Sequence, residues 1–188
     1  MMGTMASPGS PDFKLTLLEL REVVRFAAAS AREALSLFER AAPDDGRPRA
    51  AVEAALLFAN GAPRTNLQRR TAASAHRAAA EAADQVSRLA AGSAGDAAAA
   101  AYLHPLAQAT QVGHILRATA RAAEAAELEA GGQPSAAVSV LDRAQSRATP
   151  VLLDVLHRYP PARDGRSRTA HLMKTLDTAL RNPTPGSR

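Results

Sequence analysis

The twenty residues AAAAAYLHPLAQATQVGHIL, from Ala97 to Leu116, contain no Asp, Glu, Lys or Arg. Elsewhere in this chain of 188 residues, no stretch without a charged side chain is longer than twelve residues. A charge-free stretch of this length predicts burial, either in protein or in lipid. The same stretch carries Tyr, His, Gln and Thr side chains, which are costly to bury without hydrogen-bond partners. We therefore expect it to form the central helix of a bundle, the wall of a site, or both.

The composition favours helices throughout the chain. Hydrophobic residues make up 46% of it and aromatic residues only 3%. Ala supplies most of the hydrophobic residues, and it has the highest helix propensity because its side chain loses no rotamer entropy. No segment alternates apolar and polar residues between turn signals, as a strand would. Since the chain is long enough for one domain with its own core, we predict an all-α, single-domain fold.

Apolar residues at helical spacing predict seven or eight helices within residues 15–181, packed as a bundle or as stacked antiparallel helical hairpins. Two segments, Thr16–Glu19 and Thr65–Gln68, have the form of a capping box. The run Gly92–Gly95 is expected to end the third helix, and Pro105 to kink or break the charge-free helix. The expected helices span residues 17–41, 48–60, 66–90, the charge-free stretch to 130, 134–148, 150–159 and 168–180.

Both ends of the chain are expected to lie outside the domain. Residues 1–14 have the character of a flexible leader without a secretory signal, because no basic segment precedes an apolar run. Residues 182–188 have the character of a disordered tail. We therefore expect a cytoplasmic protein. The charge-free stretch has the length of a membrane span, but its His, Gln and Pro residues argue against one, and we expect no membrane association.

The polar residues of the charge-free stretch form the main candidate site. On a continuous helix, His104, Gln108 and Gln111 fall within roughly 60° of one another. His114 flanks the same side, and Tyr102 precedes it. This face is a candidate surface for a ligand or a partner. The alternative is a set of side chains that are hydrogen-bonded inside the core.

Four residues outside this stretch are further binding candidates. His76 would have to converge with the charge-free face in the folded chain. Asp44, Arg47 and Arg49 lie at the entry to the second expected helix. There they either contact a partner or fix the turn through local ion pairs, which contribute about 0–1 kcal/mol each when exposed.

The sequence argues against catalysis and against bound cofactors. The chain has no Cys, which excludes disulfides, thiolate zinc sites and Cys nucleophiles. No Ser stands in a glycine elbow, no Gly-rich phosphate loop occurs, and the His residues lack the spacing of a metal site. We predict no catalytic residue, no metal and no cofactor.

The chain is basic, with a net charge of +5 at pH 7. Positive charge concentrates in residues 47–88, where seven Arg face three acidic residues, and in residues 142–188. A basic surface suits an acidic partner, either protein or nucleic acid. The alternative is a solvated surface without a partner. Because so few aromatic residues are present for base stacking, nucleic acid is the less favoured partner.

Several segments together resemble a family of actinobacterial immunity proteins, the immunity-five-like family of polymorphic toxin systems. The similarity covers roughly residues 15 to 130, and the Arg-Pro-Arg and Leu-His-Pro-Leu-Ala blocks are its most specific parts. The matching segments are Leu20-Arg21-Glu22-Val23, Ala42-Pro43-Asp44-Asp45-Gly46-Arg47-Pro48-Arg49, Arg64-Thr65, Ala75-His76-Arg77-Ala78-Ala79, Tyr102-Leu103-His104-Pro105-Leu106-Ala107, Thr110-Gln111-Val112 and His114-Ile115-Leu116.

The resemblance implies an all-helical protein that neutralises a cognate protein toxin by binding it, without catalysis. Two other functions stay open at this point. One is a small-molecule binding or resistance protein, in which His104, Gln108, Gln111 and His114 line an apolar cavity between helices. The other is a basic protein associated with nucleic acid. The sequence also leaves a homodimer open.

Overall fold

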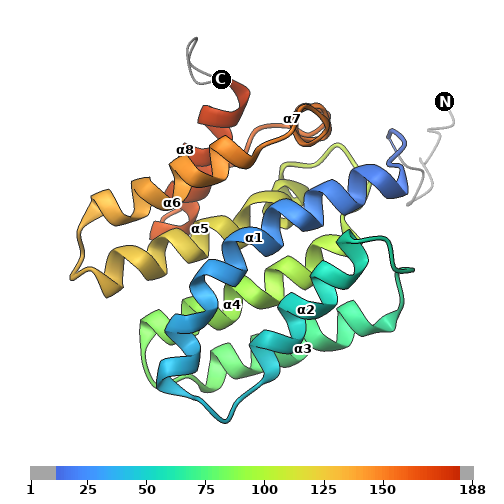
Figure 1. Ribbon diagram of the computed structural model, residues 1–188. Helices are drawn as coiled ribbons and strands as arrows, with labels where there is room; N and C mark the ends of the chain where they lie inside the picture. The colour runs from blue at the N-terminus through green and yellow to red at the C-terminus, as the bar shows by residue number, and fades with distance from the viewer. Residues whose placement is uncertain (1–11, 183–188) are drawn as a thin grey trace, which may run out of the picture.

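The computed structural model describes residues 12–182, and in that range it contains eight α-helices, two short 3-10 turns and no strand (Figure 1). This confirms the predicted all-α, single-domain fold. Residues 1–11 of the expected leader and 183–188 of the expected tail lie outside the described residues. The elements are α1 (Leu17–Ala41), α2 (Arg47–Ala59), α3 (Asn66–Glu81), α4 (Gln85–Ala99), η1 (Ala100–Tyr102), η2 (Ala109–Gln111), α5 (Val112–Glu129), α6 (Pro134–Arg147), α7 (Pro150–His157) and α8 (Arg168–Arg181).

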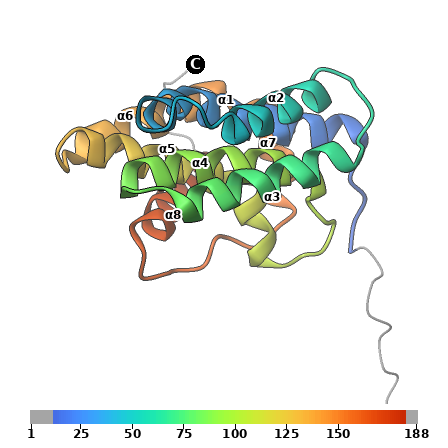
Figure 2. The same ribbon diagram turned by 90° about the horizontal axis from the view of Figure 1, so that it is seen from below.

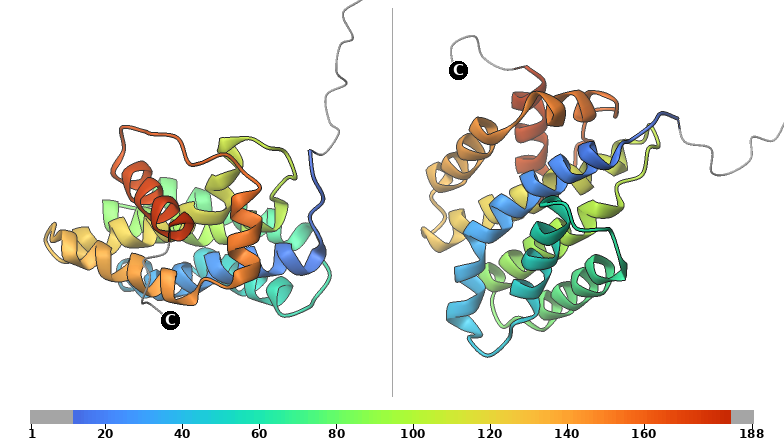
Figure 3. Two further views of the ribbon diagram at one scale, coloured as in Figure 1. Left: turned by 90° about the horizontal axis from the view of Figure 1, so that it is seen from above. Right: turned by 45° about the vertical axis from the view of Figure 1, so that its right-hand side comes forward.

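The helices are packed in layers around two central members (Figures 1 and 2). α1, α2 and α6 lie on one side, and α3, α4 and α5 run next to one another on the other side. α4 contacts α1, α2, α3 and α5, while α5 contacts α1, α4, α6 and α8. Figure 3 shows the same neighbours from two further directions. α4 and α5 are therefore the central helices, and the charge-free stretch joins them.

Local cap chemistry fixes where several helices begin. Both predicted capping boxes are present: the Thr16 N–H donates to Glu19 Oε2 at 2.7 Å, and the Thr65 N–H donates to Gln68 Oε1 at 3.1 Å. These bonds satisfy backbone groups that a helix start leaves without a partner. Gly61, which follows the Asn60 cap of α2, has a φ of +114°, a conformation that would be strained for a residue with a side chain. The chain can therefore reverse between α2 and α3.

The predicted third helix, residues 66–90, is wrong, because the chain breaks earlier than expected. α3 ends at Glu81, and Asp84 caps a new helix by accepting a hydrogen bond from the Ser87 N–H at 2.8 Å. α4 then continues through Gly92–Gly95, where we expected a break. Gly costs only about 1 kcal/mol relative to Ala in a helix interior, and here close packing against α3 and α5 offsets that cost.

The charge-free stretch is only partly helical and only partly buried. The backbone leaves the helix at Tyr102 and re-enters one at Ala109. Pro105 therefore breaks the helix, which is one of the two outcomes expected from the sequence. Ala97, Ala98, Ala100, Ala101 and Val112 are buried, but His104, Ala107, Gln108 and Thr110 are exposed. Burial of the whole stretch is therefore a wrong prediction: uncharged polar residues suit an exposed loop as well as a core. Within residues 12–182, no helix has both the length and the hydropathy of a membrane span.

The core is built mainly from Ala, with a few large side chains between the helices. Phe38, Phe58, Ile115 and Leu116 are among the largest fully buried side chains. Each Ala removes little apolar area from water, so the few large residues carry a disproportionate share of the hydrophobic free energy.

The neighbours Phe58 and Leu57 offer a direct test of this distribution. Phe58 is fully buried, whereas 53% of Leu57 is exposed. Phe58→Ala should lower the free energy of unfolding by about 3–5 kcal/mol because it leaves a cavity. Leu57→Ala, the matched control, should change it by no more than about 0.5 kcal/mol. Urea denaturation measures both, and equal losses would contradict this account of the core.

Candidate functional site

The five candidate residues of the charge-free stretch do not share a helix face, because most of them lie outside helices. Tyr102 ends η1, His104 and Gln108 lie in the loop that follows, Gln111 ends η2 and only His114 lies in α5. The predicted common face is therefore wrong. The structure brings two of them together, since the His104 N–H donates to Gln111 Oε1 at 3.0 Å.

The loop between η1 and η2 is held by distant parts of the chain. The Ala107 N–H donates to Asp12 Oδ2 at 2.6 Å, and the Asp12 N–H donates to the Pro105 carbonyl at 2.9 Å. The Tyr159 hydroxyl donates to the His104 carbonyl at 2.8 Å. Asp12 belongs to the expected leader, yet it is tied to the domain. The loop is thus a fixed part of the surface.

Tyr102 is enclosed by two arginines from the start of α3. The Arg64 and Arg69 guanidinium carbons lie 5.7 and 4.6 Å from the centre of its ring. The Tyr102 hydroxyl also donates to the Thr65 carbonyl at 2.7 Å. Cation–π contacts of this kind contribute roughly 0.5–1 kcal/mol at exposed sites. Both arginines are held in place while they stay exposed.

A buried carboxylate on α4 organises a second group of basic residues. The side chain of Asp96 is only 3% exposed, and its Oδ1 accepts a hydrogen bond from Arg117 Nε at 3.1 Å. Arg121 Nη1 lies 2.9 Å from Oδ2, but Oδ2 accepts no aligned hydrogen bond within residues 12–182. His76 Nε2 lies 3.6 Å from Oδ1. A carboxylate buried this deeply needs cationic partners to remain charged.

Two glycines of α4 make room for these side chains. A Cβ atom on Gly92 would lie 2.7 Å from Arg121 Nη1, and a Cβ atom on Gly95 would lie 2.8 Å from the His76 ring. Both distances are shorter than a normal contact. The glycines therefore let Arg121 of α5 and His76 of α3 lie directly against the α4 backbone, on a side of α4 where both remain partly exposed.

Burial lowers the pKa of the two histidines near Asp96. For His76, desolvation by burial is the main cause of the lowered pKa, and the negative charge of Asp96 offsets that lowering only in part. Loss of solvent also lowers the pKa of His114, and Arg117 adds to the effect. Both imidazoles are therefore neutral at neutral pH. With one carboxylate and two guanidinium groups, the Asp96 cluster then carries a net charge of +1.

The two groups of arginines belong to one surface. Arg69 and His76 are seven residues apart on α3, so they lie on the same side of that helix, roughly 10 Å apart. Arg69 contacts Tyr102 and His76 contacts Asp96, and α3, α4 and α5 run next to one another (Figure 2). We call this surface the basic face and define it by Arg64, Arg69, His76, Tyr102, Arg117 and Arg121.

The candidates at the start of α2 lie elsewhere and make contacts within the chain. Arg47 bridges Asp45, at 2.7 Å, and Glu81, at 2.6 Å, and it lowers the pKa of Asp45 by hydrogen bonding. Arg49 forms a bidentate pair with Glu39 at 2.7 and 2.8 Å. Asp44 is exposed. These contacts tie α2 to α1 and α3 and leave the cluster separate from the basic face.

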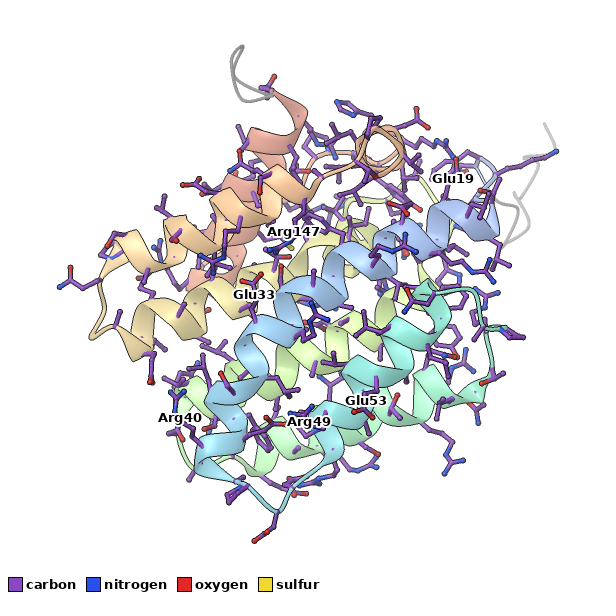
Figure 4. The ribbon with its side chains drawn as sticks, viewed as in Figure 1. Glu19, Glu33, Arg40, Arg49, Glu53 and Arg147 are labelled. Atoms are coloured by element: carbon purple, nitrogen blue, oxygen red, sulfur yellow. The ribbon has the colours of Figure 1, made fainter. Side chains whose placement is uncertain are left out.

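Two arginines of α6 that face α1 are also paired with a carboxylate. Arg143 and Arg147 of α6 both face Glu33, at 2.9 and 2.5 Å, and Figure 4 shows Glu33 and Arg147 pointing toward one another. By contrast, Arg64, Arg69, Arg70 and Arg77 of the α3 region form no ion pair with any described residue. Four arginines without an ion pair among the described residues therefore lie on α3 or just before it.

Three grooves of the described domain lie away from the candidates of the charge-free stretch. A groove of about 270 Å³ lies between α1, α5 and α6, and two others, of about 260 and 540 Å³, lie along α1. No residue of the segment 102–114 lines any of these three. In the part of the chain that the structure describes, no three His, Asp or Glu side chains are grouped to hold a metal ion.

Reasoning from the sequence missed Asp96, Arg117 and Arg121. A signal was present, because Asp96 is the only acidic residue between Asp84 and Glu124. A lone carboxylate within an Ala- and Gly-rich helix requires a cationic partner. Arg117 and Arg121, one helical turn apart directly after the charge-free stretch, were suitable partners.

The structure thus defines an all-helical domain with an exposed basic face and no grouped metal ligands among its described residues. Residues 14–146, more than half of the chain, match the family described as Imm-5 like putative immunity protein, and the chain belongs to that family. The match includes the segments from which the resemblance was drawn. No curated protein and no solved structure matches the chain.

The Asp96 cluster can be tested by removing its cations. Arg117→Met combined with Arg121→Met leaves a buried carboxylate without a strong partner, and it should lower the free energy of unfolding by about 3–5 kcal/mol. Adding Asp96→Ala should recover at least half of that loss. Urea denaturation measures each variant. Arg32→Met, an exposed arginine of α1, is the control. A double variant as stable as the natural chain would show that Asp96 needs neither arginine.

Acidification should destabilise the fold through His76 and His114. Their pKa values are lowered on folding, so below a pH of about 6.5 the unfolded chain binds more protons than the folded chain. The free energy of unfolding then falls as the pH falls through this window. The melting temperature at about pH 7.5 should exceed that at about pH 5.5, and His114→Gln should reduce the difference. His171→Gln, at an exposed position of α8, should leave it unchanged.

Proposed function

We propose that this protein neutralises a toxin of its own polymorphic toxin system by binding the toxin through the basic face. Binding is stoichiometric and non-catalytic, and it takes place in the cytoplasm. Membership of the immunity family implies a cognate toxin. The observation that favours this particular surface is that two of its arginines, Arg64 and Arg69, are exposed and form no ion pair within residues 12–182.

The chemistry of the basic face supports a protein partner. Arg and Tyr are enriched at protein interfaces, and both occur here in fixed positions. The Arg69–Tyr102 contact and the Asp96 cluster hold long side chains in place before binding. Less conformational entropy is then lost on association. Positive charge also raises the rate at which an acidic partner is captured.

The two alternatives from the sequence have weaker support. A small-molecule site lined by His104, Gln108, Gln111 and His114 has no matching groove among the three that lie on α1 and its neighbours. Nucleic acid would be attracted to the basic face, but Tyr102 is the only Phe, Tyr or Trp among the six residues that define it, and Arg64 and Arg69 already cover the Tyr102 ring.

A growth assay tests the proposal. The genes that flank this one in its genome are searched for a toxin, which is then expressed with and without the chain. The natural chain should restore growth, and the two purified proteins should form a one-to-one complex. Arg69→Glu should weaken that complex at least about tenfold, or about 1.4 kcal/mol, because it reverses a charge in the basic face.

Arg32→Glu makes the same charge change on α1 and should leave the complex intact. Circular dichroism confirms that both variants are folded. The proposal fails if the toxin kills equally with and without the chain. The choice of surface fails if Arg32→Glu and Arg69→Glu weaken the complex equally. Steep loss of DNA binding with salt, without toxin binding, would favour the nucleic-acid alternative.

A further inference from the structure

We propose that Arg117 and Arg121 form a binding site for carboxylate groups of an acidic segment on the partner. Asp96 holds both arginines in place from the buried side. This inference rests on the proposed function, because it names the chemistry by which the basic face recognises the toxin. The geometry points to this pair among the arginines of residues 12–182, for three reasons that concern donors, rigidity and charge.

The first reason is that both guanidinium groups retain free donors. Each guanidinium carries five N–H donors. Arg117 uses Nε for Asp96, and Arg121 makes only the 2.9 Å ion-pair contact with Oδ2. The two side chains are 39% and 28% exposed. Their remaining donors make no hydrogen bond with another described residue, so they can receive a carboxylate from solvent.

The second reason is that the pair is held rigidly. Gly92 and Gly113 let the two guanidinium groups lie close to the backbone, at 2.7 and 3.1 Å from the Cβ positions that these residues lack. Asp96 is fixed within α4 and is 3% exposed. An arginine fixed in this way loses little side-chain entropy when it binds a second carboxylate. Flexible surface arginines lack this advantage.

The third reason is charge. Asp96 neutralises one of the two guanidinium groups, and a net charge of +1 remains while His76 is neutral. Asp96 contacts both guanidinium groups from the buried side. A carboxylate of the partner would contact the same two groups from the solvent side, so the pair is suited to binding carboxylates. Arg–carboxylate contacts of the bidentate kind are strong and directional. A Lys pair would keep the charge but lose this geometry.

Binding of hexaglutamate to the natural chain tests the inference without any toxin. Isothermal titration is run at about 20 mM salt, where screening is weak. We expect saturable binding and shifts in the side-chain Nε–H NMR signals of Arg117 and Arg121. The double variant Arg117→Lys, Arg121→Lys keeps the net charge and should bind at least about tenfold more weakly because it lacks the planar fork.

Arg143→Lys combined with Arg147→Lys is the matched control. These two arginines are also four residues apart on one helix and also face one carboxylate, Glu33, but they lie outside the basic face. This variant should bind hexaglutamate as the natural chain does. Equal binding by all three proteins would mean general electrostatic attraction and would overturn the inference, as would the absence of binding.

A six-nucleotide DNA strand of thymidines is the second probe. If it shifts the Arg117 and Arg121 signals at lower concentration than hexaglutamate does, the site binds phosphate in preference to carboxylate, and the inference fails. Preference for hexaglutamate supports it. Because the toxin takes no part in these measurements, a failure here leaves the growth assay unaffected. A chain that binds hexaglutamate as expected but does not protect against the toxin would refute only the proposed function.

Discussion

The structure depends on the close approach of α4 to its neighbours. α4 is built largely from Ala, Gly and Ser, and it contacts four other helices at once. Small side chains permit this approach, but each of them contributes little apolar area. Stability must then come from many close contacts and from a few large residues such as Phe58 and Leu116. The same close approach leaves one buried carboxylate, Asp96, whose partners are two arginines of α5 and the imidazole of His76 on α3.

The sequence was most informative where local chemistry decides the structure. The capping boxes at Thr16 and Thr65 were predictable because the donor, the acceptor and their spacing all lie within four residues. The break at Pro105 was predictable because proline removes a backbone donor. The end of α3 was missed. There, Ala82–Asp84 interrupts an Ala-rich run that reads as helix throughout, and only the Asp84 cap marks the boundary.

The site was less predictable than the fold because it is assembled from contacts between helices. His76, Asp96 and Arg117 come from three helices, and their spacing in the chain has no fixed relation to their spacing in space. A helical-wheel argument placed His104 and Gln108 on one face, but a wheel holds only while the helix continues. His76 and His114 were both named from the sequence. Asp96, the carboxylate that contacts His76, was not.

Substitution of Gly92 or Gly95, which are both buried, would change the exposed surface of this protein. Neither residue is exposed, yet each determines how closely a side chain, Arg121 or His76, approaches the α4 backbone. A single extra methyl group at either position would lift His76 or Arg121 outward and alter the shape that a partner meets. Such a change would leave every exposed residue as it was. If the basic face binds a partner as proposed, variation at these buried glycines would change which partner fits while the exposed residues stayed the same.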